Sequence, residues 1–411
     1  MLDYLPLEIS QNILFKLSLQ CLIICTSVCK SWKSMIKNSN FIQDHLTFKN
    51  KYGPPLLLLH CATRKRCDAF SNKLIKEEMA EFYSLHYDNH DFSKYYDVEV
   101  PIAVDNGMPC LHVVGTCNGL VCIADDLAVE ANKFIICNPL IRKSVTLPVP
   151  NLRIENYDHT GSPLKYNVSI GFGYDAETND YKVVRLVTLL NGASPTVAEV
   201  YSLATGSWSP RRRVNGVSEM EACTPQAFVN GILHWLAIYE AEDGNSYYFI
   251  LTFDVHTESF SKLMMPEIVP SRASAKLQVS VSSDGKSIAL FSRNFVDTVF
   301  DRFLDIWIMQ EYGVHESWTI WTTLRAIGPS ESRSLLPKAL CFRVNGEIVS
   351  EIFDDNVCRW FWHLYCVGHR LYSIHPSGWW RNLEYSGFRY YTVNSYKESL
   401  VLLDMDNVVS Y

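Results

Sequence analysis

The feature that most constrains the fold is a set of Asn-Gly and Asp-Gly pairs, each lying between two short apolar segments. Asn or Asp followed by Gly tolerates the positive φ angles that a tight hairpin turn requires. The four pairs are Asn118-Gly119, Asn230-Gly231, Asp284-Gly285 and Asn345-Gly346. Because the flanking apolar segments have the length of strands, most of the chain is predicted to fold as antiparallel hairpins.

The hairpins recur at a loosely regular spacing. Comparable units begin near Gly115, Gly171, Gln226, Gln278 and Ala339, at intervals of 52 to 61 residues. The blades of common propellers repeat about every 40–50 residues. Loop insertions account for the longer period here. The repeat therefore predicts five blades of a β-propeller.

The strand segments are apolar on both faces, as in Tyr181–Val187 and Ser287–Phe291. A sheet packed between two neighbouring sheets needs this pattern, whereas a half-solvated sheet would alternate. Further strand-like segments remain at Leu56–His60 and Glu81–Tyr87, before the five units, and at Tyr390–Leu403, after them. Joined in one sheet, they complete a sixth blade and remove exposed sheet edges. The sequence thus predicts an all-β domain, a six-bladed β-propeller closed by strands from both ends.

The first 36 residues have a different periodicity. Pro6 suits the first position of a helix, because its φ is already helical and its missing N–H would have no partner there. Ile9, Ile13, Leu14 and Leu17 then follow at spacings that gather apolar side chains into one stripe. These residues predict an amphipathic first helix.

Three more helices are expected before the β domain. Ser18 is a candidate N-cap for a helix at Leu19–Cys25, and a third helix is predicted from about Cys29 to Ile36. A fourth, short helix follows around Phe41, and Gly53-Pro54-Pro55 breaks it. So short a segment cannot bury its own apolar stripes, and either the rest of the chain or a partner must cover them. The predicted division is a helical module at 1–45, a connecting segment at 46–54 and the β domain at 55–411.

The helical segment carries a recognisable motif. The pattern L-P-x-E-I-x-x-x-I-L-x-x-L at Leu5–Leu17, with V-C-K-S-W at Val28–Trp32, resembles the F-box. Members of that family dock on a Skp-type adaptor, which connects them to a cullin-RING ubiquitin ligase. Two departures are Ser18, where the family usually has Pro, and the lack of a basic residue near Ile23. The resemblance implies adaptor contacts, or supports for them, at Leu5, Pro6, Ile9, Ile13, Leu17, Leu22, Val28, Cys29 and Trp32. The alternative is that these residues form an ordinary helical core.

The β-rich part resembles the F-box-associated domain of plant F-box proteins, including the S-locus-type family. Together with the F-box, this resemblance covers nearly the whole chain. It implies that the β domain binds a target protein, whose identity the resemblance does not give. The resemblance rests on G-T-C-N-G-L-V-C-I at 115–123, C-N-P-L-I-R-K at 137–143, G-F-G-Y-D and D-Y-K-V-V within 171–184, V-Y-S-L-A-T-G-S-W at 200–208, V-N-G-I-L-H-W-L at 229–236, and W-I-M-Q-E-Y-G-V-H-E-S-W at 307–318.

Two groups of residues have side chains that can bind metal ions, but neither has the spacing of a known site. Cys21, Cys25 and Cys29 recur every four residues, yet no fourth zinc ligand lies nearby, so buried thiols are the simpler interpretation. The segment His86–Asp91 lacks HExxH or EF-hand spacing and is expected to be a solvated loop. We expect no metal and no cofactor.

Composition limits the classes of partner and compartment. The net charge of −7 argues against nonspecific binding of nucleic acid. No apolar run approaches the 18 residues of a membrane span, and the first residues do not resemble a secretory signal. The 13 cysteines form no C-x-x-C pair, which favours reduced thiols. We therefore expect a protein of the cytoplasm, the nucleus or both.

The leading interpretation is a substrate-recognition subunit of an SCF (Skp–cullin–F-box) ubiquitin ligase, without catalytic residues of its own. No Walker loop, G-x-S-x-G or dinucleotide-binding motif occurs. The alternatives are a propeller enzyme with an unrecognised active site and an adaptor-bound scaffold that does not transfer substrates.

Surface loops are the expected place for target binding, because binding residues commonly lie on loops held by a rigid frame. Two basic runs, Arg64–Arg66 and Arg211–Arg213, also lie in predicted loops, where they are solvated or pair with acidic groups of a partner. The expected target-binding loops are Arg153–Pro163, Asn191–Thr196, Arg211–Thr224 and Ala241–Ser246.

Overall fold

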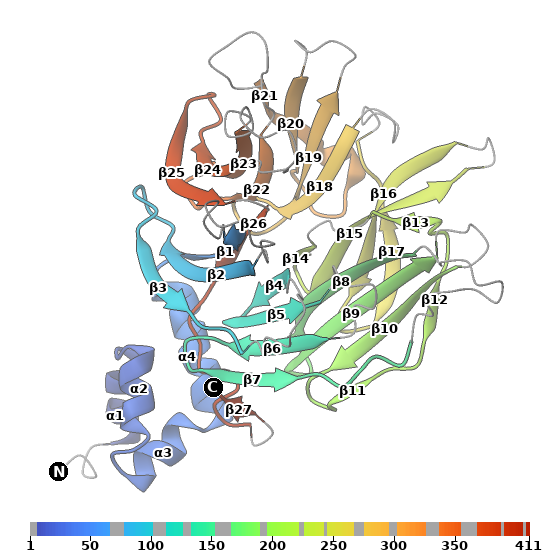
Figure 1. The fold of residues 1–411 in the computed structure, drawn as a ribbon. Helices are drawn as coiled ribbons and strands as arrows, with labels where there is room; N and C mark the ends of the chain where they lie inside the picture. The colour runs from blue at the N-terminus through green and yellow to red at the C-terminus, as the bar shows by residue number, and fades with distance from the viewer. Residues whose placement is uncertain are drawn as a thin grey trace, which may run out of the picture.

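The computed structural model describes fourteen stretches of the 411-residue chain, and every structural statement below refers to them. Four helices precede the strands (Figure 1). They are α1 (Leu7–Phe15), α2 (Leu19–Cys25), α3 (Lys30–Ile36) and α4 (Ser39–Tyr52). The described residues are 6–65, 78–101, 112–125, 133–152, 166–189, 195–221, 226–241, 245–266, 275–295, 302–325, 337–354, 368–387, and 390–405 with 408–411.

The strands of the described residues form six antiparallel sheets arranged as the blades of a propeller, which confirms the predicted fold. In pairing order, blade 1 contains β26 (Tyr390–Tyr396), β1 (Leu56–Lys65), β2 (Glu78–Tyr87) and β3 (Lys94–Val98). Blade 2 contains β27 (Val409–Ser410), β7 (Lys143–Thr146), β6 (Phe134–Asn138), β5 (Leu120–Ala124) and β4 (His112–Cys117). Blade 3 contains β11 (Ser207–Trp208), β10 (Thr196–Ser202), β9 (Asp180–Leu189) and β8 (Tyr166–Asp175), with β12 (Arg212–Val214) also on β10.

The second half of the ring repeats the pattern. Blade 4 contains β13 (Glu219–Met220), β15 (Ile232–Glu240), β16 (Ser246–Asp254) and β17 (Ser259–Leu263), with β14 (Ala227–Val229) also on β15. Blade 5 contains β18 (Ala275–Val281), β19 (Ile288–Phe295), β20 (Arg302–Met309) and β21 (Trp318–Arg325). Blade 6 contains β22 (Lys338–Phe342), β23 (Ile348–Asp354), β24 (Gly368–Ile374) and β25 (Trp380–Gly387). Strands of each blade contact the next blade, and β22 of blade 6 contacts β26 of blade 1.

The predicted turns take the expected backbone conformation. Asn118 and Gly119 have φ of 50° and 80°, and Asn230 and Gly231 have φ of 53° and 75°. Both residues of each pair are therefore in the left-handed region, as a tight two-residue hairpin turn requires. Gly285 and Gly346 also have positive φ. Trp208, Trp235 and Trp318 are buried, as is common for large aromatic side chains that fill space between sheets.

Blade 1 is built from both ends of the chain. β1 pairs along its length with β2 on one side, and its first seven residues pair with β26 on the other. The expected strand within Ser399–Leu403 is wrong, because β26 ends at Tyr396. The Asn138 side-chain amide donates instead to the carbonyl oxygens of Ser399 and Val401, at 2.9 and 3.0 Å. A long-range side-chain contact thus takes the backbone groups that a strand would have paired.

The helix boundaries differ from the expectation at two places. Pro6 is the N-cap of α1 rather than its first residue, because its ψ of 146° is extended while its carbonyl oxygen already accepts from the amides of Ile9 and Ser10. The fourth helix is longer than expected, since α4 continues through the predicted connecting segment to Tyr52. Ser18 caps α2 as predicted, accepting from the Cys21 amide at 3.3 Å.

The helices pack on the propeller through one shared apolar core. This core contains Leu14, Leu19, Leu22, Ile36, Phe41 and Ile42 of the helices together with Leu58, Tyr396, Leu400 and Leu403 of the β domain. Polar contacts also cross this joint, among them Lys49 with Glu398 at 2.9 Å, Gln43 with Tyr174 at 2.6 Å and Ser39 with Asp404 at 2.9 Å. The segment that follows β26 therefore connects α4 to the propeller.

His45 of α4 lies in this joint and is fully buried. Among the described residues, neither nitrogen of its ring has a hydrogen-bond partner. Its ring packs near Phe15 and Phe41, with centroid separations of 6.1 and 6.3 Å. Burial, with a smaller contribution from the charge of Lys49, lowers the pKa of His45 to about 4. The joint thus favours a neutral imidazole.

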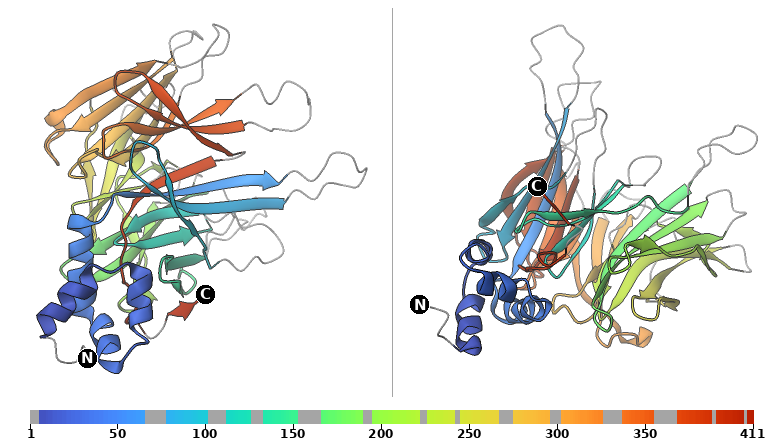
Figure 2. Two further views of the ribbon diagram at one scale, coloured as in Figure 1. Left: turned by 90° about the vertical axis from the view of Figure 1, so that its left-hand side faces the viewer. Right: turned by 90° about the horizontal axis from the view of Figure 1, so that it is seen from below.

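The helices lie at one end of the propeller. At one end α4 finishes, β1 begins, and β4, β18 and β22 reach the hairpin turns that follow them; we call this the helix-side end. The left view of Figure 2 shows the helices on this side, and the strands extending away from it. Among the described helices, none is long and apolar enough to cross a membrane.

Candidate functional site

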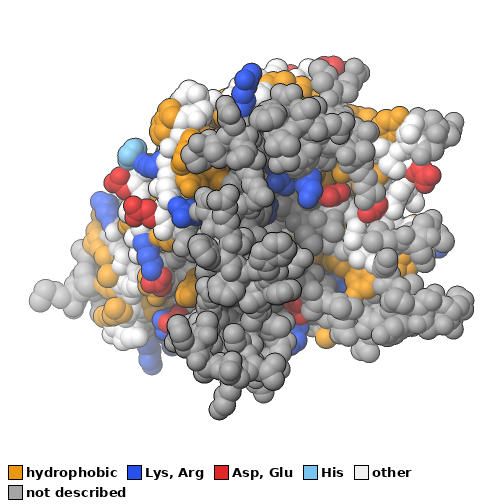
Figure 3. Space-filling model, turned by 45° about the horizontal axis from the view of Figure 1, so that its top comes forward, with side chains coloured by type: hydrophobic (Ala, Val, Ile, Leu, Met, Phe, Trp, Pro, Cys, Tyr) orange, Lys and Arg blue, Asp and Glu red, His pale blue; other side chains and the backbone are white. Residues whose placement is uncertain are grey.

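Within residues 6–45, the side chains that the structure describes include four large apolar ones that are exposed. Ile9 and Ile13 of α1 expose 47% and 43% of their surface, Ile24 of α2 exposes 66%, and Val28, between α2 and α3, exposes 62%. Ile9 and Ile13 are four residues apart on one helix and therefore share a face. Figure 3 shows that apolar side chains reach the surface at several places on the face that it draws. Such side chains are available to another protein.

The predicted apolar stripe of α1 is divided between two surroundings. Leu14 is fully buried in the joint with the propeller, whereas Ile9 and Ile13 face outward. The expectation of a single stripe with Leu17 is therefore wrong, because the apolar residues cover two faces of the helix. Leu17 is half-buried against the joint core.

The other residues that the F-box resemblance selected act mainly as supports. Leu22 is fully buried, and Trp32 is half-buried against the same core. Cys29 is the N-cap of α3, with its Sγ accepting from the Trp32 amide at 3.4 Å. Pro6 is exposed at the start of α1, and Leu5 lies outside the described residues. Contact of these residues with an adaptor stays a prediction.

Sequence reasoning missed Ile24 as a surface residue. It lies two residues after Leu22, which places the two side chains on nearly opposite sides of α2. An apolar residue opposite a buried one is the available signal, and the continuous apolar run at Leu22–Ile24 concealed it.

A pocket of about 500 Å³ lies on the axis of the propeller at the helix-side end. Five of the six blades line it, through Gly115, Phe228, Val281, Phe342 and Asn394 among others. Volumes of about 300–1,000 Å³ are typical of binding sites for small ligands. The pocket is therefore large enough to hold part of a bound molecule.

Both the helices and the propeller match known protein families. Residues 74–402 match the F-box associated beta propeller domain, and residues 2–44 match the F-box domain. The chain belongs to the F-box-associated propeller family. This confirms both resemblances found in the sequence.

Curated relatives are F-box proteins of Arabidopsis thaliana. F-box protein CPR1 is 26% identical over 338 residues, which cover 77% of this chain and 71% of that protein. F-box protein At3g07870 is 24% identical over 385 residues, covering 85% and 83%. The solved structure titled "Structure of Dos1 propeller" has a TM-score of 0.36 and 10% identity, over 84% of this chain and 92% of that one. That structural likeness is too low to bear on function.

One wall of the axial pocket is held by a buried arginine of this F-box-associated propeller. Arg343, with 1% of its surface exposed, donates through Nε to Asp88 at 2.9 Å and through Nη1 to Glu347 at 2.9 Å and Ser373 at 3.1 Å. Burial would raise the pKa of Glu347, but hydrogen bonds from Ser373 and Asn345 and the charge of Arg343 leave that pKa lowered. These groups satisfy one another and hold blade 6 against blade 1.

The same contacts revise the expectation for the segment His86–Asp91. His86 and Asp88 are buried, whereas His90 and Asp91 are exposed. The solvated-loop prediction is therefore wrong for His86 and Asp88, because Asp88 accepts from Arg343, 255 residues away in sequence.

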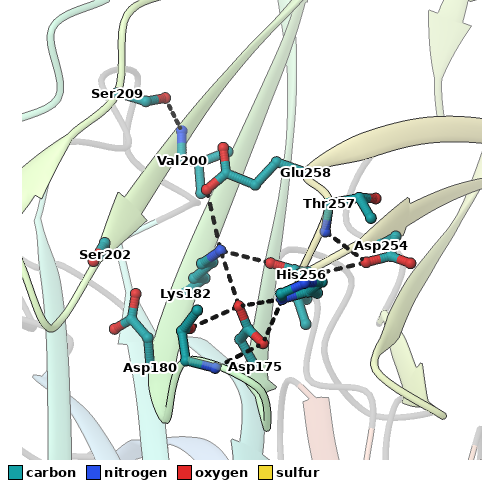
Figure 4. Close-up of polar contacts among 12 residues, drawn as sticks. Asp175, Asp180, Lys182, Val200, Ser202, Ser209, Asp254, His256, Thr257 and Glu258 are labelled. Atoms are coloured by element: carbon teal, nitrogen blue, oxygen red, sulfur yellow. Dashed lines mark hydrogen bonds and ion pairs between the residues drawn. The ribbon is translucent and has the colours of Figure 1, made fainter.

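A second buried ion network joins blades 3 and 4 at the helix-side end (Figure 4). Lys182 of β9 donates to the Val255 carbonyl at 2.6 Å and lies 3.4 Å from Asp175 and 3.1 Å from Glu258. The His256 ring nitrogen Nδ1 lies 3.2 Å from Asp175. Burial would raise the pKa of Asp175, but hydrogen bonds in its turn and the Lys182 charge leave it lowered. All five residues lie in hairpins of blades 3 and 4, so the network links these neighbouring blades.

The remaining candidate metal and basic groups are placed as follows. Within the described stretches, no group of three or more His, Cys, Asp or Glu side chains is arranged to hold a metal ion. Cys21 and Cys25 lie on α2 and Cys29 caps α3, so the three do not share one helix. Arg212 pairs with Glu258 of blade 4, and Arg211 donates to the Asn151 carbonyl at 3.1 Å.

The expected target-binding loops are only partly visible. Residues 153–163, 191–194, 222–224 and 242–244 lie outside the described residues, as does Arg66. At 212–214 and 219–220 the expectation of a loop is wrong, because β12 pairs with β10 and β13 pairs with β15. Arg64 and Lys65 likewise lie in β1 rather than in a loop. These short edge strands contain polar residues, so their sequences lack the apolar pattern by which strands are recognised.

Proposed function

We propose that this chain is the target-recognition subunit of an SCF-type ubiquitin ligase. The helical module binds a Skp-type adaptor, and the propeller binds a target protein. One observation supports this most directly: the module buries Leu14 and Leu22 against its own propeller while it leaves Ile9, Ile13 and Ile24 exposed. A segment that served only as a structural core would bury both sets.

The joint between module and propeller suits this role. Its apolar core and the Lys49–Glu398 ion pair fix α4 on the propeller, so a target on the propeller keeps a constant orientation to the adaptor. In such a ligase the chain contributes by proximity, because it raises the local concentration of target lysines near the recruited conjugating enzyme. It needs no catalytic side chain of its own.

The adaptor interface is tested by titrating the full-length chain with a purified Skp-type adaptor in a calorimeter. The double substitution Ile9→Ala, Ile13→Ala should weaken binding by about tenfold or more, because two exposed anchors of one helix face are removed. Met264→Ala is the matched control, since Met264 is an apolar side chain 47% exposed on the propeller. Unchanged affinity in the double variant, or no complex with the wild-type chain, would contradict the proposal.

Receptor and scaffold are separated by a second measurement. The full-length chain is reconstituted with the adaptor, a cullin-RING core, ubiquitin and its activating and conjugating enzymes, together with proteins crosslinked to the propeller in cell extract. A receptor gives ubiquitin transfer to those proteins that depends on Ile9 and Ile13. Capture without transfer would indicate a scaffold instead.

A further inference from the structure

The axial pocket is lined by strands whose edge on that side pairs with no other strand. Two carbonyl oxygens on these edges already accept hydrogen bonds from side chains, Ser395 from Thr116 and Leu340 from Gln278. β4, β18, β22 and β26 are each the terminal strand of their sheet, and the pocket lies where these strands reach the helix-side end. The backbone N–H and C=O groups on such an edge lack partners in their own sheet, and an extended peptide can pair with them. The pocket therefore has the hydrogen-bonding groups that suit a peptide chain.

The charged side chains that line the pocket differ in whether they already have a hydrogen-bond or ion-pair partner. Asp88 and Arg343 are paired with each other, and Asp284 accepts hydrogen bonds within its own hairpin turn. Lys397, just after β26, is half-buried in the pocket wall and has no hydrogen-bond or ion-pair partner among the described residues. The pocket therefore offers one uncommitted positive charge, which suits a carboxylate.

Beside the pocket lies a ledge of exposed apolar side chains, Val344, Trp379 and Trp380. Val344 borders the pocket and exposes 64% of its surface, and the two tryptophans expose 49% and 46%. Their rings are held in place: Trp379 stacks on His375 at 4.9 Å, and Trp380 packs edge-on against Tyr372 at 5.0 Å. Rigid, half-exposed tryptophans are typical anchors of protein interfaces.

The pocket and the ledge are close enough for one short peptide. Val344 follows β22, and Trp380 begins β25, three strands further out in blade 6. At about 4.8 Å between strands, the two are separated by roughly 14 Å, the length of about four extended residues. Arg381, which follows Trp380, donates to His90, and His90 lies two residues after the pocket residue Asp88.

We propose that the pocket and the Trp379–Trp380 ledge bind an extended segment of the target protein that has large apolar residues and one acidic residue. The carboxylate pairs with Lys397, an apolar side chain enters the pocket, and another packs on the tryptophans. This inference rests on the proposed function, whose target it describes. It places the target on the end of the propeller that carries the helices, opposite the loops expected from the sequence.

The experiment selects peptides from a phage-displayed library of random dodecapeptides on the immobilised full-length chain. Selected sequences are synthesised with a fluorescent label, and their affinity is measured by fluorescence anisotropy. We expect sequences that combine one Asp or Glu with large apolar residues a few positions away. Lys397→Glu and Trp380→Ala should each weaken binding of these peptides by about tenfold or more.

Two control variants match these substitutions. Lys276→Glu reverses an exposed charge at the other end of β18, and Ile320→Ala truncates a side chain 51% exposed on β21. Both should leave peptide affinity unchanged. Circular dichroism and adaptor titration on the same preparations show that each variant is folded.

The outcomes separate this inference from the proposed function. Failure to enrich any peptide, or peptides that bind Lys397→Glu and Trp380→Ala as tightly as the wild-type chain, would overturn the pocket as the target site even if the adaptor still binds. If the wild-type chain does not bind the adaptor but still selects peptides, the ligase role is refuted. The pocket is then still supported as a peptide-binding site.

Discussion

The amino-terminal helices expose apolar side chains, whereas the strands of blade 3 bury them. Ile9 and Ile13 expose nearly half of their surface, whereas in β9 every side chain from Asp180 to Thr188 is buried. Both regions lie within residues that match known families, 2–44 for the helices and 74–402 for the propeller. This difference indicates that the residues which the strands share with their family stabilise the fold. Those which the helices share with theirs form an exposed surface. Substitutions should therefore change stability in the propeller and binding in the helices.

The strongest test of this contrast removes the segment that connects the two regions. Deletion of residues 397–411 takes away Leu400 and Leu402, which are fully buried, and Glu398, which pairs with Lys49. Each buried leucine is worth about 2–5 kcal/mol, and domains are stable by only about 5–15 kcal/mol. We expect the truncated chain to lose cooperative unfolding by circular dichroism.

Deletion of residues 408–411 alone is the control for this truncation. It removes only β27, whose two residues are exposed, together with the residues beside them. The midpoint of thermal unfolding should fall far less than in the longer deletion. A longer truncation that unfolds at the wild-type temperature would show that the segment after β26 is not needed to hold helices and ring together.

Within the propeller, the ion network of Figure 4 should make β9 sensitive to a single charge. Lys182→Met leaves Asp175, with 1% of its surface exposed, without its ammonium partner. Removing one member of a buried pair costs about 3 kcal/mol, because the other charge stays buried. Urea unfolding at pH 7 measures this loss, and adaptor affinity should not change.

The double variant Asp175→Asn, Lys182→Met distinguishes a charge effect from a packing effect. It removes both charges and should recover much of the lost stability. If Lys182→Met alone unfolds at the wild-type urea concentration, the network contributes nothing to joining blades 3 and 4.

The contrast also separates what sequence could predict from what it could not. Hairpin turns such as Asn118-Gly119 depend on two adjacent residues, and the two-sided apolar strands reflect burial between sheets, so blades and their number followed from local patterns. Contacts between distant segments did not. Asn138 replaces strand pairing at Ser399–Val401, and Arg343 draws Asp88 into the interior.

The candidate site was predictable to a similar, limited degree. The F-box motif identified Ile9 and Ile13, but helical periodicity alone cannot say which apolar face the propeller covers. Leu14 is buried and Ile24 is exposed because of where the segment after β26 packs, which no local pattern encodes. The axial pocket likewise combines residues from five blades, including the isolated Lys397.

At the joint itself, acid should weaken the folded state through His45. The unfolded chain binds a proton at this residue below about pH 6.5, whereas in the folded chain burial holds the His45 pKa at about 4. Stability is therefore lost as pH falls from about 6.5 toward 4, by about 2 kcal/mol at pH 5 from this group. Urea unfolding at pH 7.5 and pH 5 measures the loss.

His45→Phe supplies the comparison, because a phenyl ring suits the neighbours Phe15 and Phe41 and cannot take up a proton. The variant should lose about 2 kcal/mol less than the wild-type chain over the same pH interval. Equal losses in the two proteins would mean that His45 does not titrate differently in the folded and unfolded states.

The smallest expected effect on stability is at Ile24, the surface residue that the sequence did not reveal. Because two thirds of its surface is already exposed, Ile24→Ala should change the free energy of unfolding by no more than about 0.5 kcal/mol. The same substitution should weaken adaptor binding, since it truncates another large, exposed apolar side chain of the helical module. Leu22→Ala, two residues earlier and fully buried, is the matched opposite and should cost about 2–5 kcal/mol of stability. If Ile24→Ala instead destabilises the chain as much as Leu22→Ala, the helices do not present a binding surface and the contrast drawn between the two regions fails.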